Sequence, residues 1–164
     1  MVKAWEAGED AFPLENSPLV KDSRTEARIC AVQALFQAKA RGQDVADVAA
    51  EFAGARLKRR KADKKMFDAI TAEAARGAER HAALIGANLL EEWPMDRLDA
   101  VHYALLWAAT AELFARADVT PPVVINEFVN IAKGFVASPE EVAFVNATLD
   151  KIARAVRGEF FVKA

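Results

Sequence analysis

Residues 98–113 read LDAVHYALLWAATAEL, a stretch in which most side chains are apolar. Leu98, Val101, Leu105 and Ala108 recur at the three- and four-residue spacing of one helix face. Pro94 breaks the chain just before this stretch. We therefore predict a helix here that is apolar enough to lie at the centre of the fold.

Two further helices are predicted downstream of this central stretch. Thr120, followed by Pro121 and Pro122, is typical of a helix start, and apolar residues at helical spacing continue to Phe135. The run Ser138-Pro139-Glu140-Glu141 has the spacing of a capping box. It is predicted to open a last helix that ends at Gly158.

Upstream, the same spacing predicts helices over residues 23–42, 44–54 and 63–90. Ser23 and Glu26 have the spacing of another capping box. Gly54 is expected to end the second of these helices, and Gly77 is expected to be a weak or closely packed point in the third. Residues 56–65, which hold seven basic side chains, are predicted to be an exposed loop.

These elements predict an all-α domain of six or seven helices, because no alternating run or hairpin signal indicates a strand. At 164 residues, one core and therefore one domain is expected. We place that domain at residues 23–158. Residues 1–22 are predicted to be an acidic and flexible N-terminal extension, and residues 159–164 a C-terminal tail.

Composition excludes several classes of protein. With 22 Lys and Arg against 24 Asp and Glu, the net charge of −2 argues against a bulk polycation, although a local basic patch is compatible with it. The single cysteine, Cys30, excludes a disulfide framework within the chain. No signal peptide or membrane span is evident. We expect a cytoplasmic protein.

Catalytic and metal-binding motifs are missing from the sequence. There is no glycine-rich phosphate loop, no nucleophile elbow and no Cys/His set at metal-ligand spacing. His81 falls on an apolar helical stripe, where core packing is the simpler interpretation. We predict no catalytic residue, no metal and no cofactor.

The positive signal is a candidate anion site at the start of the first helix. Arg24 and Arg28 are four residues apart and share a helix face, and Lys21 lies just upstream. A helix N-terminus adds free amides and a partial positive charge, so phosphate is the expected ligand. The alternative is that both arginines are solvated at the rim of the core. For residues 56–65, non-specific RNA contact and a solvated loop remain equal alternatives.

Four segments, taken together, resemble the bacterial NusB family of transcription antitermination factors. They occur in the family's order over about residues 24–156, and they are Ala27–Phe36 (ARICAVQALF), Trp93–Val101 (WPMDRLDAV), Val124–Phe135 (VINEFVNIAKGF) and Phe144–Lys151 (FVNATLDK).

The resemblance implies an all-helical NusB-type bundle of two packed subdomains. It implies binding to the boxA element of ribosomal RNA leaders, together with the ribosomal protein NusE, within a transcription elongation complex. Arg24 and Arg28 match the family's arginine-rich stretch, although Thr25 and Glu26 stand where some members have further arginines. Whether the chain is a monomer or a dimer stays open.

The same resemblance implies further site residues. Phe135 and Phe144 match aromatic residues beside a loop linked to RNA contact, with core packing as the alternative for both. His102 stands at a position used in some members for NusE, and Phe36 is the second candidate partner contact.

Two alternative functions remain. In the first alternative, the chain is a helical protein-interaction adaptor with weakened RNA binding, which the depleted arginine stretch allows. In the second alternative, it is a stand-alone relative of the NusB-like domain of ribosomal RNA methyltransferases.

Overall fold

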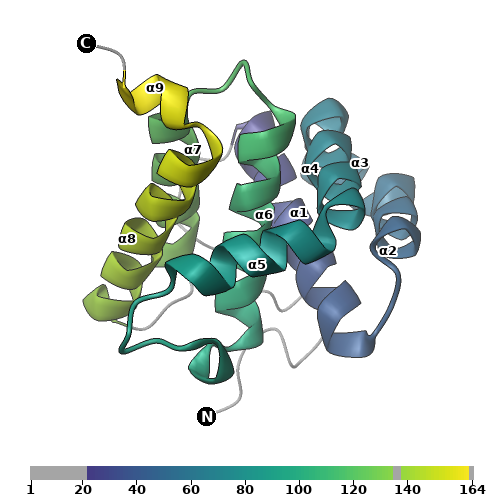
Figure 1. Cartoon of the computed structure of the whole chain (residues 1–164). Helices are drawn as coiled ribbons and strands as arrows, with labels where there is room; N and C mark the ends of the chain where they lie inside the picture. Colours follow the sequence, from purple (N-terminus) through teal and green to yellow (C-terminus); the bar gives the residue numbers. More distant parts are fainter. Residues whose placement is uncertain (1–21, 135–137, 163–164) are drawn as a thin grey trace.

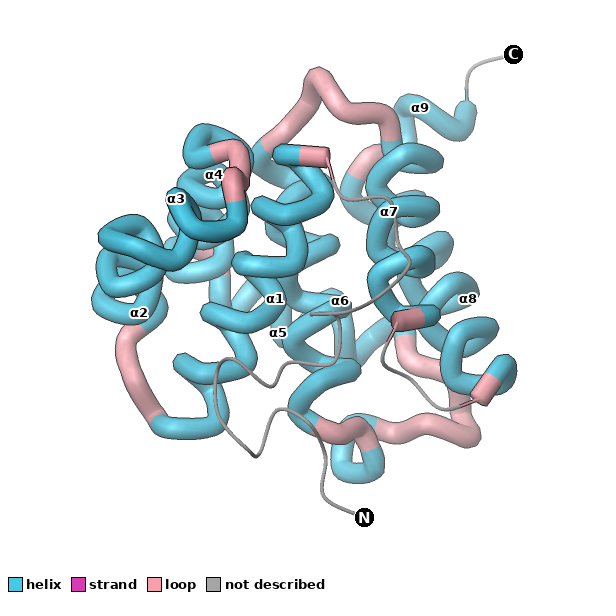
Figure 2. The backbone as a smooth tube through the Cα atoms, turned by 180° about the vertical axis from the view of Figure 1, so that it is seen from behind, coloured by secondary structure: helices cyan, strands magenta, loops and turns pink. Residues whose placement is uncertain are grey.

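The computed structural model describes residues 22–134 and 138–162, and all regular structure in these ranges is helical, as predicted (Figure 2). A π-helical turn, Phe52–Arg56, joins α2 to α3, and a 3-10 turn, Met95–Arg97, precedes α6. The α-helices are α1 (Ser23–Arg41), α2 (Val45–Glu51), α3 (Leu57–Arg60), α4 (Lys64–Arg76), α5 (Ala78–Asn88), α6 (Ala100–Ala115), α7 (Pro121–Lys133), α8 (Pro139–Val156) and α9 (Gly158–Val162).

The helices form two packed groups, α1–α4 and α5–α9, as the resemblance implies. Helix α6 belongs to the second group but also packs against α1 and α4 of the first. In Figure 1, α2, α3 and α4 lie on one side of α6, α7, α8 and α9 lie on the other, and α5 crosses in front. The central position predicted for α6 is confirmed.

The core follows the predicted apolar spacing. Each full burial of a large apolar side chain contributes about 1.5–3 kcal/mol. Six residues whose spacing predicts burial are completely buried, namely Ile29, Val32, Leu105, Phe128, Ile131 and Leu149.

Several predicted helix ends are confirmed. Gly42 ends α1 in the left-handed conformation, with φ at 64°. The side chains of Asp44 and Asp63 cap α2 and α4. Ser138 and Glu141 form the reciprocal capping box expected at the start of α8.

The capping box predicted at Ser23 is wrong. Helix α1 begins one residue earlier than that box requires, and the Asp22 carboxylate accepts from the Thr25 amide at 2.8 Å. The Glu26 carboxylate, which would have completed the box, instead accepts from Arg60 Nε at 2.8 Å. Glu26 therefore makes a long-range ion pair in place of the local hydrogen bond to a backbone amide.

There are more helical segments than the six or seven predicted, and the predicted loop at residues 56–65 is mostly helical. Gly54 does not end a helix, because the chain continues through the π turn into α3, where Arg56 and Leu57 are buried. Gly77 divides the predicted helix 63–90 into α4 and α5. Residues 158–162, placed partly in the tail, form the short α9.

Gly77 allows a close contact between its backbone and two buried side chains. The His81 ring is completely buried, and its Nε2 lies 2.9 Å from Glu73 Oε2. A Cβ on residue 77 would lie 2.7 Å from His81 Nε2 and 3.0 Å from Glu73 Oε2. The His81 ring also stacks on Phe114, so it has little room to move away.

We therefore expect Gly77→Ala to lower the free energy of unfolding by about 1–3 kcal/mol, the usual effect of overpacking. Gly54→Ala is the matched control, because a Cβ there meets no atom within 4 Å. That control should leave stability unchanged or raise it by about 0.4–1 kcal/mol. Urea unfolding measures both variants, and equal stability of the two would contradict the close contact.

Candidate nucleic-acid interface

The first turns of α1 are held by a buried ion pair. Arg28 Nε donates to Glu112 Oε1 and Arg28 Nη2 donates to Glu112 Oε2, both at 2.7 Å. Arg28 Nη1 donates to Glu127 Oε1 at 3.1 Å. One guanidinium thus joins α1 to α6 and α7 with the two parallel bonds of the strongest arginine–carboxylate geometry.

Arg28 is buried, so it is neither the exposed phosphate ligand that the sequence predicts nor a solvated arginine at the rim of the core, which was the alternative. Only 3% of its surface is exposed. Burial by itself lowers the pKa of Arg28, but the hydrogen bonds and charge of Glu112, with the charge of Glu127, raise that pKa above its usual value. A phosphate cannot reach this guanidinium without displacing a buried carboxylate, so Arg28 anchors the helix.

Thr25 and Glu26 also point into the molecule. Thr25 Oγ1 donates to Glu127 Oε1 at 3.0 Å. Glu26 is 6% exposed and binds Arg60 of α3. Both residues are departures from the family's arginine-rich stretch, and both now connect α1 to neighbouring helices.

Arg24 is the exposed arginine of this end of α1. It lies in the first turn, where the Asp22 carboxylate already caps the helix amides, so its guanidinium is the group that remains for an anion. The neighbouring carboxylate of Asp118 is already paired with Arg116 at 2.8 Å, and the hydrogen bond and charge of Arg116 lower the pKa of Asp118 to about 2. Lys21, the third cation predicted here, lies outside the described residues.

The structure brings the basic segment 56–65 to the same end of α1. The Asp63 amide donates to the Ser23 carbonyl at 2.9 Å, and Arg60 binds Glu26 in the first turn of α1. Lys58, Arg59, Lys61, Lys64 and Lys65 are exposed. The sequence did not predict this adjacency, because the two segments are separated by the whole of α2.

Phe144 and His102 lie together in a second cluster, away from Arg24. Phe144 is 2% exposed, and its ring stacks on Trp93 with centroids 4.9 Å apart. His102 is 4% exposed, its Nδ1 lies 2.7 Å from Asp99 Oδ1, and its ring packs edge-on to Phe144. His102 Nε2 lies 3.2 Å from Glu141 Oε1 without hydrogen-bond geometry.

Neither Phe144 nor His102 therefore presents a ring to the surface, and core packing is the outcome for Phe144. Trp93, which is only partly buried, covers both of them. We identified Trp93 as part of a family motif but not as a site residue. Phe135 lies outside the described residues.

The two clusters lie at opposite ends of the α1–α6 pair. Arg28 meets Glu112, and Lys39 lies over the Tyr103 ring at 4.5 Å, so the two helices run antiparallel. Ten residues of α6 separate Glu112 from His102, about 15 Å at the helical rise. Phe36, half-buried near the C-terminal end of α1, is on the His102 side.

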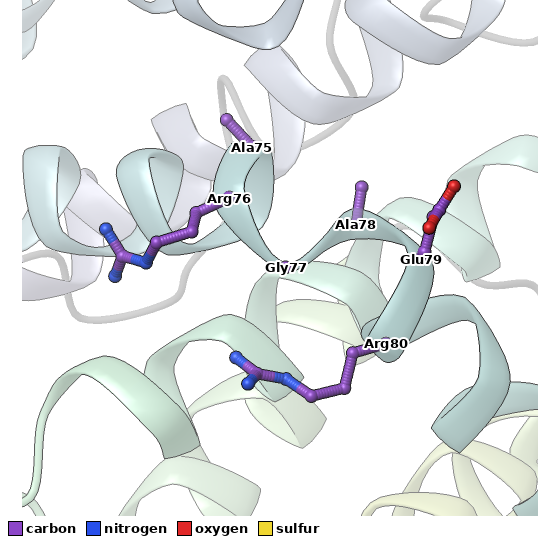
Figure 3. A pocket seen from close by; sticks show the side chains of 6 residues that line it. All are labelled: Ala75, Arg76, Gly77, Ala78, Glu79 and Arg80. Carbon is purple, nitrogen blue, oxygen red and sulfur yellow. The ribbon is translucent and has the colours of Figure 1, made fainter.

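A hollow of about 470 Å³ lies at the junction of α4 and α5, and Figure 3 shows Arg76 and Arg80 extending to the same side of it. Both arginines bind Glu73, at 2.7 and 2.6 Å. Burial alone would raise the pKa of Glu73, but hydrogen bonds from Arg76, His81 and Arg80 hold that pKa below its usual value. Burial lowers the pKa of His81. This cluster fixes the angle between the two helices.

No group of three metal-ligating side chains occurs in the described part of the chain. Burial raises the pKa of the Cys30 thiol to about 12, which makes it a poor nucleophile. None of the described helices is both long and apolar enough to cross a membrane.

The sequence of this chain is similar to the sequences of known proteins. The sequence model of the NusB family matches residues 25–154. The transcription antitermination protein NusB of Sinorhizobium medicae is 40% identical over 145 residues, which cover 84% of this chain and 90% of that protein. The protein of the same name from Agrobacterium fabrum is 39% identical over 154 residues, 90% of this chain and 93% of that protein.

A solved structure has the same fold. The structure titled T. maritima NusB, P3121, Form 2, superposes with a TM-score of 0.68 and 28% sequence identity. The match covers 88% of this chain and all of that chain (100%).

We expect Glu112→Gln to lower the free energy of unfolding by about 3 kcal/mol, because it leaves Arg28 buried with only the partly exposed Glu127. The double variant Arg28→Met, Glu112→Leu should lose less, since it leaves no charge of this pair buried. Chemical denaturation of the three proteins measures the difference. A single variant more stable than the double would mean that the ion pair does not secure α1.

Proposed function

This chain belongs to the NusB family of transcription antitermination factors, and we propose that it binds boxA-type RNA of ribosomal RNA leaders together with the ribosomal protein NusE, without catalysing a reaction. The observation that carries the RNA part is the gathering of exposed cations at one end of α1. A chain of net charge −2 would repel RNA on average, so such binding needs a local basic surface.

In this proposal, Arg24 contacts an RNA phosphate at the start of α1. Its guanidinium supplies the charge, because the Asp22 carboxylate already caps the amides at the start of the helix. Arg28 contributes indirectly, because its ion pair with Glu112 holds that turn against α6. Lys21 and Phe135 remain predicted RNA contacts.

The partner surface in this proposal lies at the other end of the α1–α6 pair, around Phe36 and Trp93. The buried rings of His102 and Phe144 pack against the Trp93 ring. Their burial makes them positioning residues for NusE rather than contacts. The relatives named NusB match over 90% or more of their own length, which supports this function over that of a methyltransferase-domain relative.

We expect NusE to raise the affinity for boxA-type RNA by adding a second RNA-binding surface. Fluorescence anisotropy with a labelled boxA RNA, with and without NusE, measures the effect, and a scrambled RNA of equal length is the control. Equal affinity with and without NusE would remove the cooperative part of the proposal. No binding in either condition would favour the interaction-adaptor alternative.

Arg24→Gln should weaken RNA binding while leaving the helix content unchanged. Losing one phosphate contact on single-stranded RNA should flatten the slope of log K against log salt by about 0.7. Arg41→Gln is the matched control, because Arg41 is also exposed and ends the same helix about 26 Å away along the axis. An equal slope for the two variants would place the RNA surface away from the start of α1.

A further inference from the structure

We infer that the basic segment 56–65 is a second phosphate-binding surface for RNA, continuous with Arg24, and that it supplies charge which the first helix of this chain does not offer. This inference rests on the proposed function. It concerns the sugar-phosphate backbone of single-stranded RNA and not its bases. Nothing in the family resemblance assigns a role to this segment.

The basic segment is fixed relative to α1. The hydrogen bond from the Asp63 amide to the Ser23 carbonyl, at 2.9 Å, joins the start of α4 to the start of α1. The ion pair between Arg60 and Glu26, both largely buried, joins α3 to the first turn of α1. The segment therefore presents its cations at a constant position beside Arg24.

The basic segment has an inner and an outer face. Arg56 is 7% exposed, donates to Gln33 Oε1 at 3.2 Å and lies over the Phe52 ring, so it belongs to the core. Leu57 is buried beside it. Lys58 and Lys61 lie on the exposed side. A helical turn with a buried anchor loses less conformational freedom on binding than a solvated loop would.

The exposed cations of this surface outnumber its carboxylates. Lys58, Arg59, Lys61, Lys64 and Lys65, with Arg24, are accompanied by the nearby carboxylates of Asp22, Asp63 and Asp68. Asp68 pairs with Lys64 at 2.6 Å, and Asp63 caps α4. The surface therefore keeps a net positive charge. Arg24, on the adjoining turn of α1, extends that charge.

Among the described residues, this surface offers no exposed aromatic ring on which a base could stack. The aromatic side chains nearest in sequence, Phe52 and Phe67, are buried and stack on each other with centroids 6.1 Å apart. Sequence-specific recognition of single-stranded RNA depends on stacking and on hydrogen bonds to base edges. Contacts from lysine to phosphate give affinity that depends on salt but not on sequence.

The test is a salt titration of RNA binding for Lys58→Gln, Lys61→Asn in the full chain, with NusE present. Asparagine is chosen because residue 61 has a φ of 55°, which asparagine tolerates. Lys151→Gln, Arg154→Gln removes the same charge from exposed positions on α8 and is the matched control. Circular dichroism checks that both variants stay folded.

We expect the segment variant to flatten the salt slope by about 1.4 relative to the control, as the loss of two phosphate contacts requires. It should weaken boxA RNA and a scrambled RNA by the same factor, leaving their affinity ratio unchanged. If the wild type binds RNA and both variants share one slope, the inference is wrong and the proposed function stands. A changed affinity ratio would also overturn it, because the segment would then be reading bases. No RNA binding by the wild type would overturn the proposed function and this inference with it.

Discussion

The guanidinium of Arg28 lies where α1, α6 and α7 meet, and it is held there by two bonds of 2.7 Å to Glu112 and one of 3.1 Å to Glu127. Placing such charges in the interior costs several kcal/mol per ion, and the cost is offset only when the geometry is complete. The two-pronged fit to Glu112 allows one register of α1 along α6. The apolar surfaces of the two helices, rich in alanine, would otherwise tolerate sliding.

The buried ion pair of Arg28 determines which cations at the start of α1 are left to contact RNA in the proposed function. An arginine four residues after Arg24 looks, in a helical projection, like a second phosphate ligand, yet its charge is already used inside the protein. Thr25 and Glu26 are likewise directed to Glu127 and Arg60. The first helix is thus fixed on three sides by polar contacts. The outward positive charge at this end of α1 comes from Arg24 and from the segment that Arg60 and Asp63 attach to it.

Local periodicity predicted much of the fold, because burial repeats along each helix with the helical period. Ile29, Leu105 and Phe128 lie on such repeats, and all three are completely buried. The candidate site was less predictable, since Arg28 and Glu112 are 84 residues apart and spacing carries no information about such pairs. The sequence predicts a loop at residues 56–65 because seven basic side chains leave no apolar helical spacing there. The two inward residues, Arg56 and Leu57, are buried and help to hold the segment as a helix.

The antiparallel α1–α6 pair also separates the two surfaces that the proposed function needs. Arg24 and the basic segment lie at the Glu112 end, whereas Trp93, supported by His102 and Phe144, lies at the other. Because both ends belong to the same two helices and the Arg28–Glu112 bonds fix their register, the distance between the surfaces is set by helix length. An RNA that extended from the basic end to a protein bound at Trp93 would meet a rigid spacing. That spacing would then contribute to selection of the RNA through geometry, in addition to the contacts made at either end.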